Sequence, residues 1–216
     1  MFQQRPPDGV VGIMPGVTFY RQLPTSYQGA FGCDFAYTSK TSSDESVLVE
    51  LWREYRTEPD PLRPDAQRDA SLYYVVACDA RQQEREKFMP TLFAAHQRRP
   101  DWPLQWRGSS IERDVATLVR QTGLPLRFNT VVGDKLLTNS MLAEAWRCQR
   151  ILLPDPTVYP QHAKWVRELT DQCNAFTGRP GDSDDRVDAL GNAHFILSRV
   201  ADATGGTGVV RGSSGR

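Results

Sequence analysis

Three apolar runs in the first 80 residues constrain the fold more than any other feature of this sequence. They cover residues 29–37, 46–55 and 71–80, and they are rich in the β-branched and aromatic residues that favour strands. The segment 56–70 between the second and third runs is polar and contains proline. We therefore expect three antiparallel strands in a meander, with residues 56–70 forming a polar turn.

After residue 80 the hydrophobic pattern alternates between helical and extended segments. Pro90 lies inside the first helical segment and is expected to kink or break it. The predicted helices cover residues 81–99, 109–123, 139–150, 159–176 and 183–201, and the predicted strands cover residues 102–108, 124–132 and 151–154. A meander followed by this alternation predicts an α/β fold of the ribonuclease H-like type, a mixed β-sheet with helices on both faces.

We expect one folded domain over residues 29–202. Residues 1–28 are rich in Pro, Gly and Gln and predict an irregular lead-in, with a short strand near residues 16–23. Residues 203–216 are rich in Gly and Ser and predict a disordered tail. There is no apolar run near the ~18 residues of a membrane span and no signal-peptide pattern at the N-terminus, so we expect a soluble intracellular protein.

Composition and spacing exclude several kinds of chemistry. The four cysteines lie far apart, and the three histidines lack metal-ligand spacing, which argues against a zinc knuckle. There is no nucleophile-elbow serine, and there is no phosphate-binding loop of the G-x-x-x-x-G-K-[ST] type, so this chain alone is not expected to hydrolyse ATP. The 26 basic residues balance the 26 acidic residues, so any contact with nucleic acid must use a local basic strip.

Four aspartates gather at the start of the last predicted helix, at positions 182, 184, 185 and 188. A helix N-terminus favours a nearby acid by roughly 0.3–1 kcal/mol, and this explains one or two of them. Asp188 lies beyond the first turn, and clustered carboxylates repel one another unless a cation lies among them. The cluster therefore predicts a divalent metal ion held by carboxylate oxygens.

Further carboxylates for such a site are expected at strand ends. Asp34 ends the first predicted strand, where burial is costly for an unpaired acid. Glu112 begins a helix after a strand, although it could instead form a capping box with Ser109, and Asp114 is its rival. Asp44 and Asp79 are interpreted as turn or surface residues.

The helical spacing separates the aspartates of the last helix into two faces. Asp184 and Asp188 share one face at a spacing of four residues, whereas Asp185 points about 100° away. We expect at least one of these three side chains to face the sheet.

Four stretches in this order resemble the C-terminal nuclease domain of tailed-phage large terminase subunits. They are "GCDFAYTSKTSSDESVLV", "WRGSSIERDVATLV", "GDKLLTNSMLAEAWRCQRILLP" and "DSDDRVDALGNA", and the resemblance spans roughly residues 25 to 200. It implies a ribonuclease H-like fold and metal-dependent cutting of concatemeric DNA during genome packaging. The acids carried over by motif are Asp34, Glu112, Asp184 and Asp185, with Asp188 nearby as a further metal ligand.

The resemblance also implies the cofactors and partners. Two Mg²⁺ or Mn²⁺ ions suit a set of carboxylates without histidine. The implied partners are double-stranded DNA, a terminase ATPase domain, the small terminase subunit and the portal, and the implied location is the host cytoplasm. Lys135 is expected near the DNA path, and Arg107 and Arg113, which flank Glu112, are predicted to contact phosphates.

Two alternatives stay open at this point. One is a junction resolvase of the RuvC type or another ribonuclease H-like nuclease, which activity on four-way junctions would reveal. The other is a non-catalytic DNA-binding or docking module of the packaging motor, which would bind no Mn²⁺ at these acids.

Overall fold

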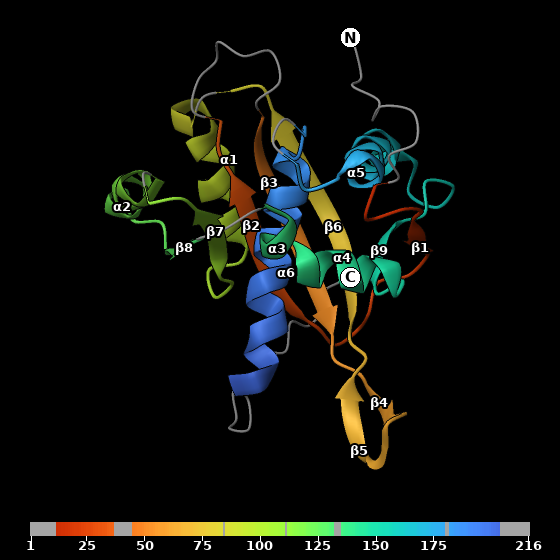
Figure 1. Ribbon diagram of the computed structural model, residues 1–216. Helices are drawn as coiled ribbons and strands as arrows, with labels where there is room; N and C mark the ends of the chain where they lie inside the picture. Colours follow the sequence, from red (N-terminus) through yellow and green to blue (C-terminus); the bar gives the residue numbers. More distant parts are fainter. Residues whose placement is uncertain are drawn as a thin grey trace.

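The computed structural model describes residues 12–36, 45–83, 85–110, 112–131, 135–179 and 182–203. Within these residues, seven strands form one mixed sheet in the order β1-β9-β6-β3-β2-β7-β8 (Figure 1). The strands are β1 (Thr18–Tyr20), β2 (Gln28–Asp34), β3 (Ser46–Glu54), β6 (Leu72–Arg81), β7 (Leu104–Gly108), β8 (Leu126–Thr130) and β9 (Ile151–Pro154). The helices are α1 (Arg85–Arg98), α2 (Glu112–Gln121), α3 (Lys135–Thr138), α4 (Ser140–Arg147), α5 (Ala163–Ala175) and α6 (Asp185–Ala203), with a 3₁₀ turn at Pro160–His162.

The predicted meander is confirmed. β2 pairs with β3, and β3 pairs with β6, both antiparallel. The later strands then join in parallel, with β7 next to β2, β8 next to β7, and β9 next to β6. The short strand expected in the lead-in is β1, which pairs in parallel with β9 at the edge of the sheet.

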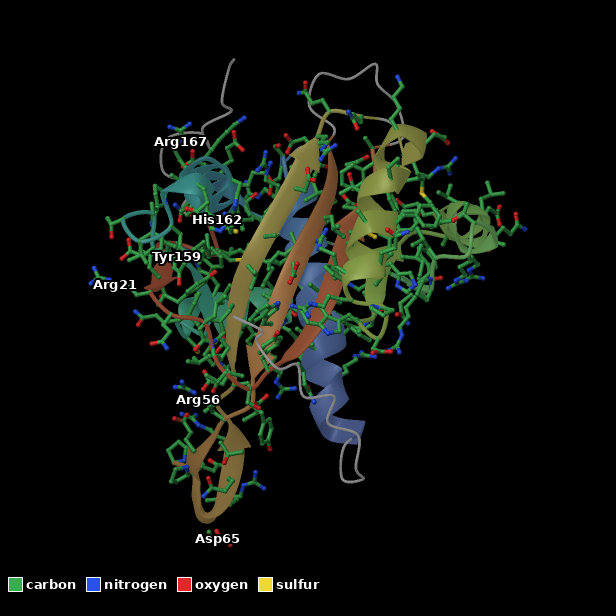
Figure 2. All side chains as sticks on the ribbon, turned by 180° about the vertical axis from the view of Figure 1, so that it is seen from behind. Arg21, Arg56, Asp65, Tyr159, His162 and Arg167 are labelled. Carbon is green, nitrogen blue, oxygen red and sulfur yellow. The ribbon has the colours of Figure 1, made fainter. Side chains whose placement is uncertain are left out.

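Helices cover both faces of the sheet, as the sequence predicted. α6 packs along β2 and β3 on one face, where α4 and α5 contribute to the same hydrophobic core (Figure 1). α1 and α2 enclose a second core on the opposite face, which Figure 2 shows from behind. The fold is thus the ribonuclease H-like arrangement, and α6 crosses the strand that ends in Asp34.

The predicted polar turn at residues 56–70 is wrong. This segment forms a hairpin of β4 (Thr57–Asp60) and β5 (Arg63–Asp69), which projects from the end of the sheet (Figure 1). Ion pairs such as Arg68 with Glu58, 2.6 Å apart, join its strands. Because most of its residues are exposed, the hairpin lacks the alternation of apolar and polar residues that marks a half-buried strand.

Pro90 does not break α1, although the sequence predicted a kink or a break at this residue. The helix runs from Arg85 to Arg98 with Pro90 inside it. Phe88 and Leu92, on either side of the proline, are fully buried. Their packing outweighs the one helical hydrogen bond that proline cannot donate.

The predicted lead-in and tail lie only partly within the residues that the structure describes. Met14 is fully buried in the core with β1 nearby, so the later half of the lead-in packs on the domain. The tail after residue 203 lies outside the described residues, as do residues 1–11 and Asp44. Among the described helices, none combines the length and apolar character needed to cross a membrane.

Candidate active site

A cavity of about 360 Å³ lies where the ends of β2 and β7 meet α3 and the first turns of α6. Four carboxylates from three separate elements line it: Asp34 of β2, Glu112 of α2, and Asp185 and Asp188 of α6. Two cationic side chains, Arg107 and Lys135, line it as well. The structure therefore brings together six of the eight residues that the sequence predicted for the site.

Gly32 allows α6 to approach β2 closely enough to place Asp34 at the cavity. A Cβ atom at Gly32 would lie only 2.1 Å from the carbonyl oxygen of Ala189 in α6. At this close approach the Asn192 side-chain amide donates a hydrogen bond to the Cys33 carbonyl oxygen at 2.8 Å. Asp34, the next residue, thereby lies beside the acidic start of the helix.

The environment of Asp34 disfavours its charged form. Burial raises the pKa of Asp34 well above its ordinary value, and repulsion from Asp188, Asp185 and Glu112 raises it further. Lys135 opposes these effects only in part. A carboxyl held in this way gains most from a cation placed among the acids.

Both interpretations of Glu112 apply at once. Its carboxylate accepts a hydrogen bond from the backbone N–H of Ser109, as in a capping box, and it also lines the cavity. Gly108 leaves room for this carboxylate, since a Cβ there would lie 2.4 Å from Glu112 Oε2. Asp114, the rival, is exposed and does not line the cavity.

Asp184 is paired with Lys135, which it shares with Asp188. The Lys135 ammonium donates to both Asp184 carboxylate oxygens at 2.7 Å, and it lies 3.3 Å from Asp188 Oδ2. Burial of Asp184 and repulsion by Asp188 raise its pKa to about 6, although Lys135 acts in the opposite direction. Asp184 does not line the cavity itself, and it is joined to the lining residue Asp188 through Lys135.

Asp185 and Asp188 are oriented by hydrogen bonds at the cavity wall. The backbone N–H of Glu45 donates to Asp185 Oδ2 at 3.0 Å. The side-chain amide of Asn139 donates to Asp188 Oδ1 at 2.7 Å. The spacing argument for the last helix is consistent with this arrangement, because Asp184 and Asp188 both reach Lys135.

Arg107 is part of the framework of the site. Its guanidinium donates to Asn192 Oδ1 at 2.7 Å, to the Thr138 carbonyl oxygen at 2.8 Å and to Asn139 Oδ1 at 3.2 Å. Burial lowers the pKa of Arg107 to about 10, so it stays charged at neutral pH. Arg113 lies elsewhere: it is exposed, donates to Thr130 Oγ1 at 2.7 Å and does not line the cavity.

Asn139 and Asn192 were missed by the sequence analysis. Both are buried, and together with Arg107 they connect β7, the junction of α3 with α4, and α6. Asn139 lies between Thr138 and Ser140, and Asn192 lies in a mainly apolar stretch of α6, so the sequence pattern alone gave no indication of their partners.

The donor set fits a hard divalent cation, since it consists of carboxylate oxygens without histidine or cysteine. In the part of the chain that the structure describes, no group of three or more Asp, Glu, His or Cys side chains is close enough together to hold a metal ion. The carboxylates thus share one cavity without forming a closed set of ligands.

Solved structures with the same fold are large terminase nuclease domains. The nuclease of the large terminase from thermophilic phage G20c with bound magnesium has a TM-score of 0.55 and 14% identity, over 87% of this chain and 98% of that one. The human cytomegalovirus terminase nuclease domain has a TM-score of 0.54 and 10% identity, over 86% and 92%. The large terminase of a second thermophilic bacteriophage has a TM-score of 0.51 and 14% identity, over 87% of this chain and 46% of that longer one. No family model and no curated protein sequence matches the chain.

Proposed function

We propose that this chain is a metal-dependent DNA endonuclease that cuts concatemeric DNA during phage genome packaging. The observation that carries the proposal is the convergence of four carboxylates from β2, α2 and α6 on one cavity. The fold shared with large terminase nuclease domains, one of them solved with magnesium, supports the assignment. The four sequence motifs that resemble this family support it independently.

Asp34, Glu112, Asp185 and Asp188 are the residues that would hold Mg²⁺ or Mn²⁺ at this cavity. Two such ions, when bound, would supply an activated water and would neutralise charge on the leaving 3′ oxygen. Without a bound cation the four acids repel one another, and the positive charge of a metal ion would relieve this repulsion. The same carboxylates would exclude the anionic DNA backbone until that charge is present.

Lys135 and Arg107 supply the fixed positive charge at the cavity. Lys135 is half-exposed, with 50% of its side-chain surface accessible, so its ammonium can reach a phosphate oxygen at the opening. Arg107 holds α6 against β7 through Asn192. Asp184 acts in this scheme as a positioning residue that orients Lys135, and Arg113 contacts DNA outside the cavity.

The partners follow from the proposed role. Double-stranded DNA is the substrate, and the terminase ATPase domain, the small terminase subunit and the portal are the proteins with which such a nuclease acts in the host cytoplasm. The large terminase of the second thermophilic bacteriophage, whose chain is about twice as long, contains the same fold as part of a larger protein.

Plasmid nicking by the purified chain tests the proposal. We expect relaxation and linearisation of supercoiled DNA with Mn²⁺ or Mg²⁺, without ATP, and no cleavage in excess EDTA. The informative pair of variants lies on one helix: Glu112→Gln should abolish cleavage, whereas Asp114→Asn, which removes an exposed acid outside the cavity, should cut as the wild type does. Equal activity of both variants would remove Glu112 from the site.

Two further outcomes would redirect the proposal. Preferential cutting of four-way junctions over linear duplex would indicate a junction resolvase. An absence of Mn²⁺ binding in calorimetry, in a chain that still binds DNA, would indicate a non-catalytic module.

A further inference from the structure

A second cavity, of about 570 Å³, lies between α4, the start of β6 and the later turns of α6. His194, Arg150, Arg147 and Tyr73 contribute to its wall, as do the acids Asp69 and Glu144. His194 follows Asp188 by six residues, which places it about 9 Å further along α6 and about 120° around the helix axis. The second cavity is therefore separate from the carboxylate cavity and opens on a different side of α6.

Two nitrogen-bearing side chains at this cavity lack the partners that buried polar groups normally have. Arg150 Nε is buried without a hydrogen-bond partner. His194 is only 4% exposed, and among the described residues its ring has an edge-to-face contact with Tyr73 but no hydrogen bond. The His194 ring can donate an N–H to a ligand in the cavity, and the guanidinium of Arg150, although its Nε is itself buried, contributes to the cavity wall.

Two arginines and two acids line the cavity, and the buried Arg53, which does not line it, competes for one of the acids. Arg53 pairs with Asp69 at 2.8 Å, and Arg147 pairs with Glu144 at 2.8 Å. Arg150 forms no ion pair with any described residue, and its Nη1 donates instead to the Asp69 carbonyl oxygen at 3.2 Å. One guanidinium at the cavity is thus left without a counter-charge.

Positive charge near His194 contributes to lowering the pKa of its ring. Its pKa is lowered to about 3, first by burial and then by Arg107, Arg150 and Arg53. Asp69 is the acid that opposes them, and its effect is smaller. An anion beside His194 would therefore meet a positive field.

From this geometry we propose that the second cavity binds a phosphate group, with Arg150 and His194 as its donors. Arginine is suited to this role, because its guanidinium offers two parallel N–H groups to phosphate oxygens. The phosphate can belong to a DNA backbone or to a free phosphate or nucleotide. The first of these sources rests on the proposed nuclease function, and it would hold the duplex at a point several nucleotides from the cut.

Histidine ring signals in NMR test the proposal directly, since the chain has only three histidines. His194→Gln identifies the signal by its loss. At pH 7, inorganic phosphate should shift the His194 signal in a saturable way and leave those of His96 and His162 in place. Sodium chloride at matched ionic strength should produce no saturable shift.

Arg150→Gln should weaken phosphate binding about tenfold or more, because a charged hydrogen-bond donor is lost. Arg167→Gln is the matched control: Arg167, labelled in Figure 2, is exposed on α5 and does not line the cavity. The wild-type titration needs no substitution, so it stands even if Arg150→Gln unfolds. An absent shift, an equal shift with chloride, or equal affinities of a folded Arg150→Gln and the wild type would overturn the proposal.

A short DNA duplex distinguishes the two sources of phosphate. Asp34→Asn protein in EDTA keeps the duplex uncut, so this arm measures binding alone. A His194 shift with duplex that Arg150→Gln weakens assigns the cavity to backbone phosphate. A shift with inorganic phosphate alone assigns it to a free phosphate or nucleotide. Neither result depends on cleavage, so loss of the nuclease proposal would leave this one standing.

Discussion

Removing the Lys135 ammonium should make the protein progressively less stable as the pH rises above 6. Lys135→Met keeps the length of the side chain but leaves the Asp184 carboxylate, whose side chain is only 5% exposed, without its cation. The pKa of Asp184 is already raised to about 6 in the presence of Lys135, so it must rise further in the variant.

The magnitude follows from proton linkage. A carboxyl whose folded-state pKa is above its unfolded value binds more protons in the folded state, so stability falls as pH rises between the two values. In the wild type this fall ends near pH 6, whereas in the variant it continues at about 1.4 kcal/mol per pH unit. Loss of the partly exposed pair with Asp188 adds up to about 1 kcal/mol. The expected loss of stability is about 2 kcal/mol at pH 7, and it grows further towards pH 8 for as long as Asp184 stays protonated in the variant.

Urea unfolding in EDTA at pH 6, 7 and 8 measures this difference for variant and wild type. Lys164→Met is the control, because Lys164 is 83% exposed and its ion pair with Glu168 is long, at 4.0 Å. This substitution should cost less than about 0.5 kcal/mol at every pH. Parallel stability curves for Lys135→Met and wild type between pH 6 and 8 would refute the argument. They would mean that Lys135 does not set the protonation of Asp184.

Three further predictions concern the metal, the framework and the hairpin. Mn²⁺ should raise the melting temperature of the wild type by mass action and that of Asp188→Asn much less, whereas equal shifts in calorimetric scans would exclude Asp188 as a ligand. Arg107→Met should lower the free energy of unfolding by about 2–4 kcal/mol in urea titrations, because three hydrogen bonds from a partly buried cation are lost; a loss below about 1 kcal/mol would contradict its framework role. Replacing residues 58–68 by a short Gly-Asn turn should change the melting temperature by no more than about 4 °C, since the hairpin is largely exposed, and a larger fall would show that it supports the sheet.

The central part of the fold could be predicted because its strands are buried on both faces or nearly so. β2 and β3 consist almost entirely of buried residues, and such runs are visible in a single sequence. The hairpin at Thr57–Asp69 could not be predicted in the same way. Its cohesion comes from strand pairing and surface ion pairs, neither of which leaves a hydrophobic pattern.

The candidate site was predicted as a set of residues but not as an arrangement. Asp34, Glu112, Asp185 and Asp188 meet at one cavity because their strand and helix ends converge in the fold. The position of Asp184 depends on the side chain with which it pairs. The sequence does not reveal that this partner is Lys135, 49 residues away. Local spacing therefore identifies candidate acids, whereas their partners depend on tertiary packing.

The close packing of α6 on Gly32 has a consequence for when the site can exist. Asp34 is made early by the ribosome, but the carboxylates it needs are carried by a helix that begins at Asp185. A growing chain that ends before this helix holds Asp34 at a strand end without the two aspartates of α6, although Glu112 has already been made. The order of synthesis thus delays assembly of the proposed site until α6 has been made.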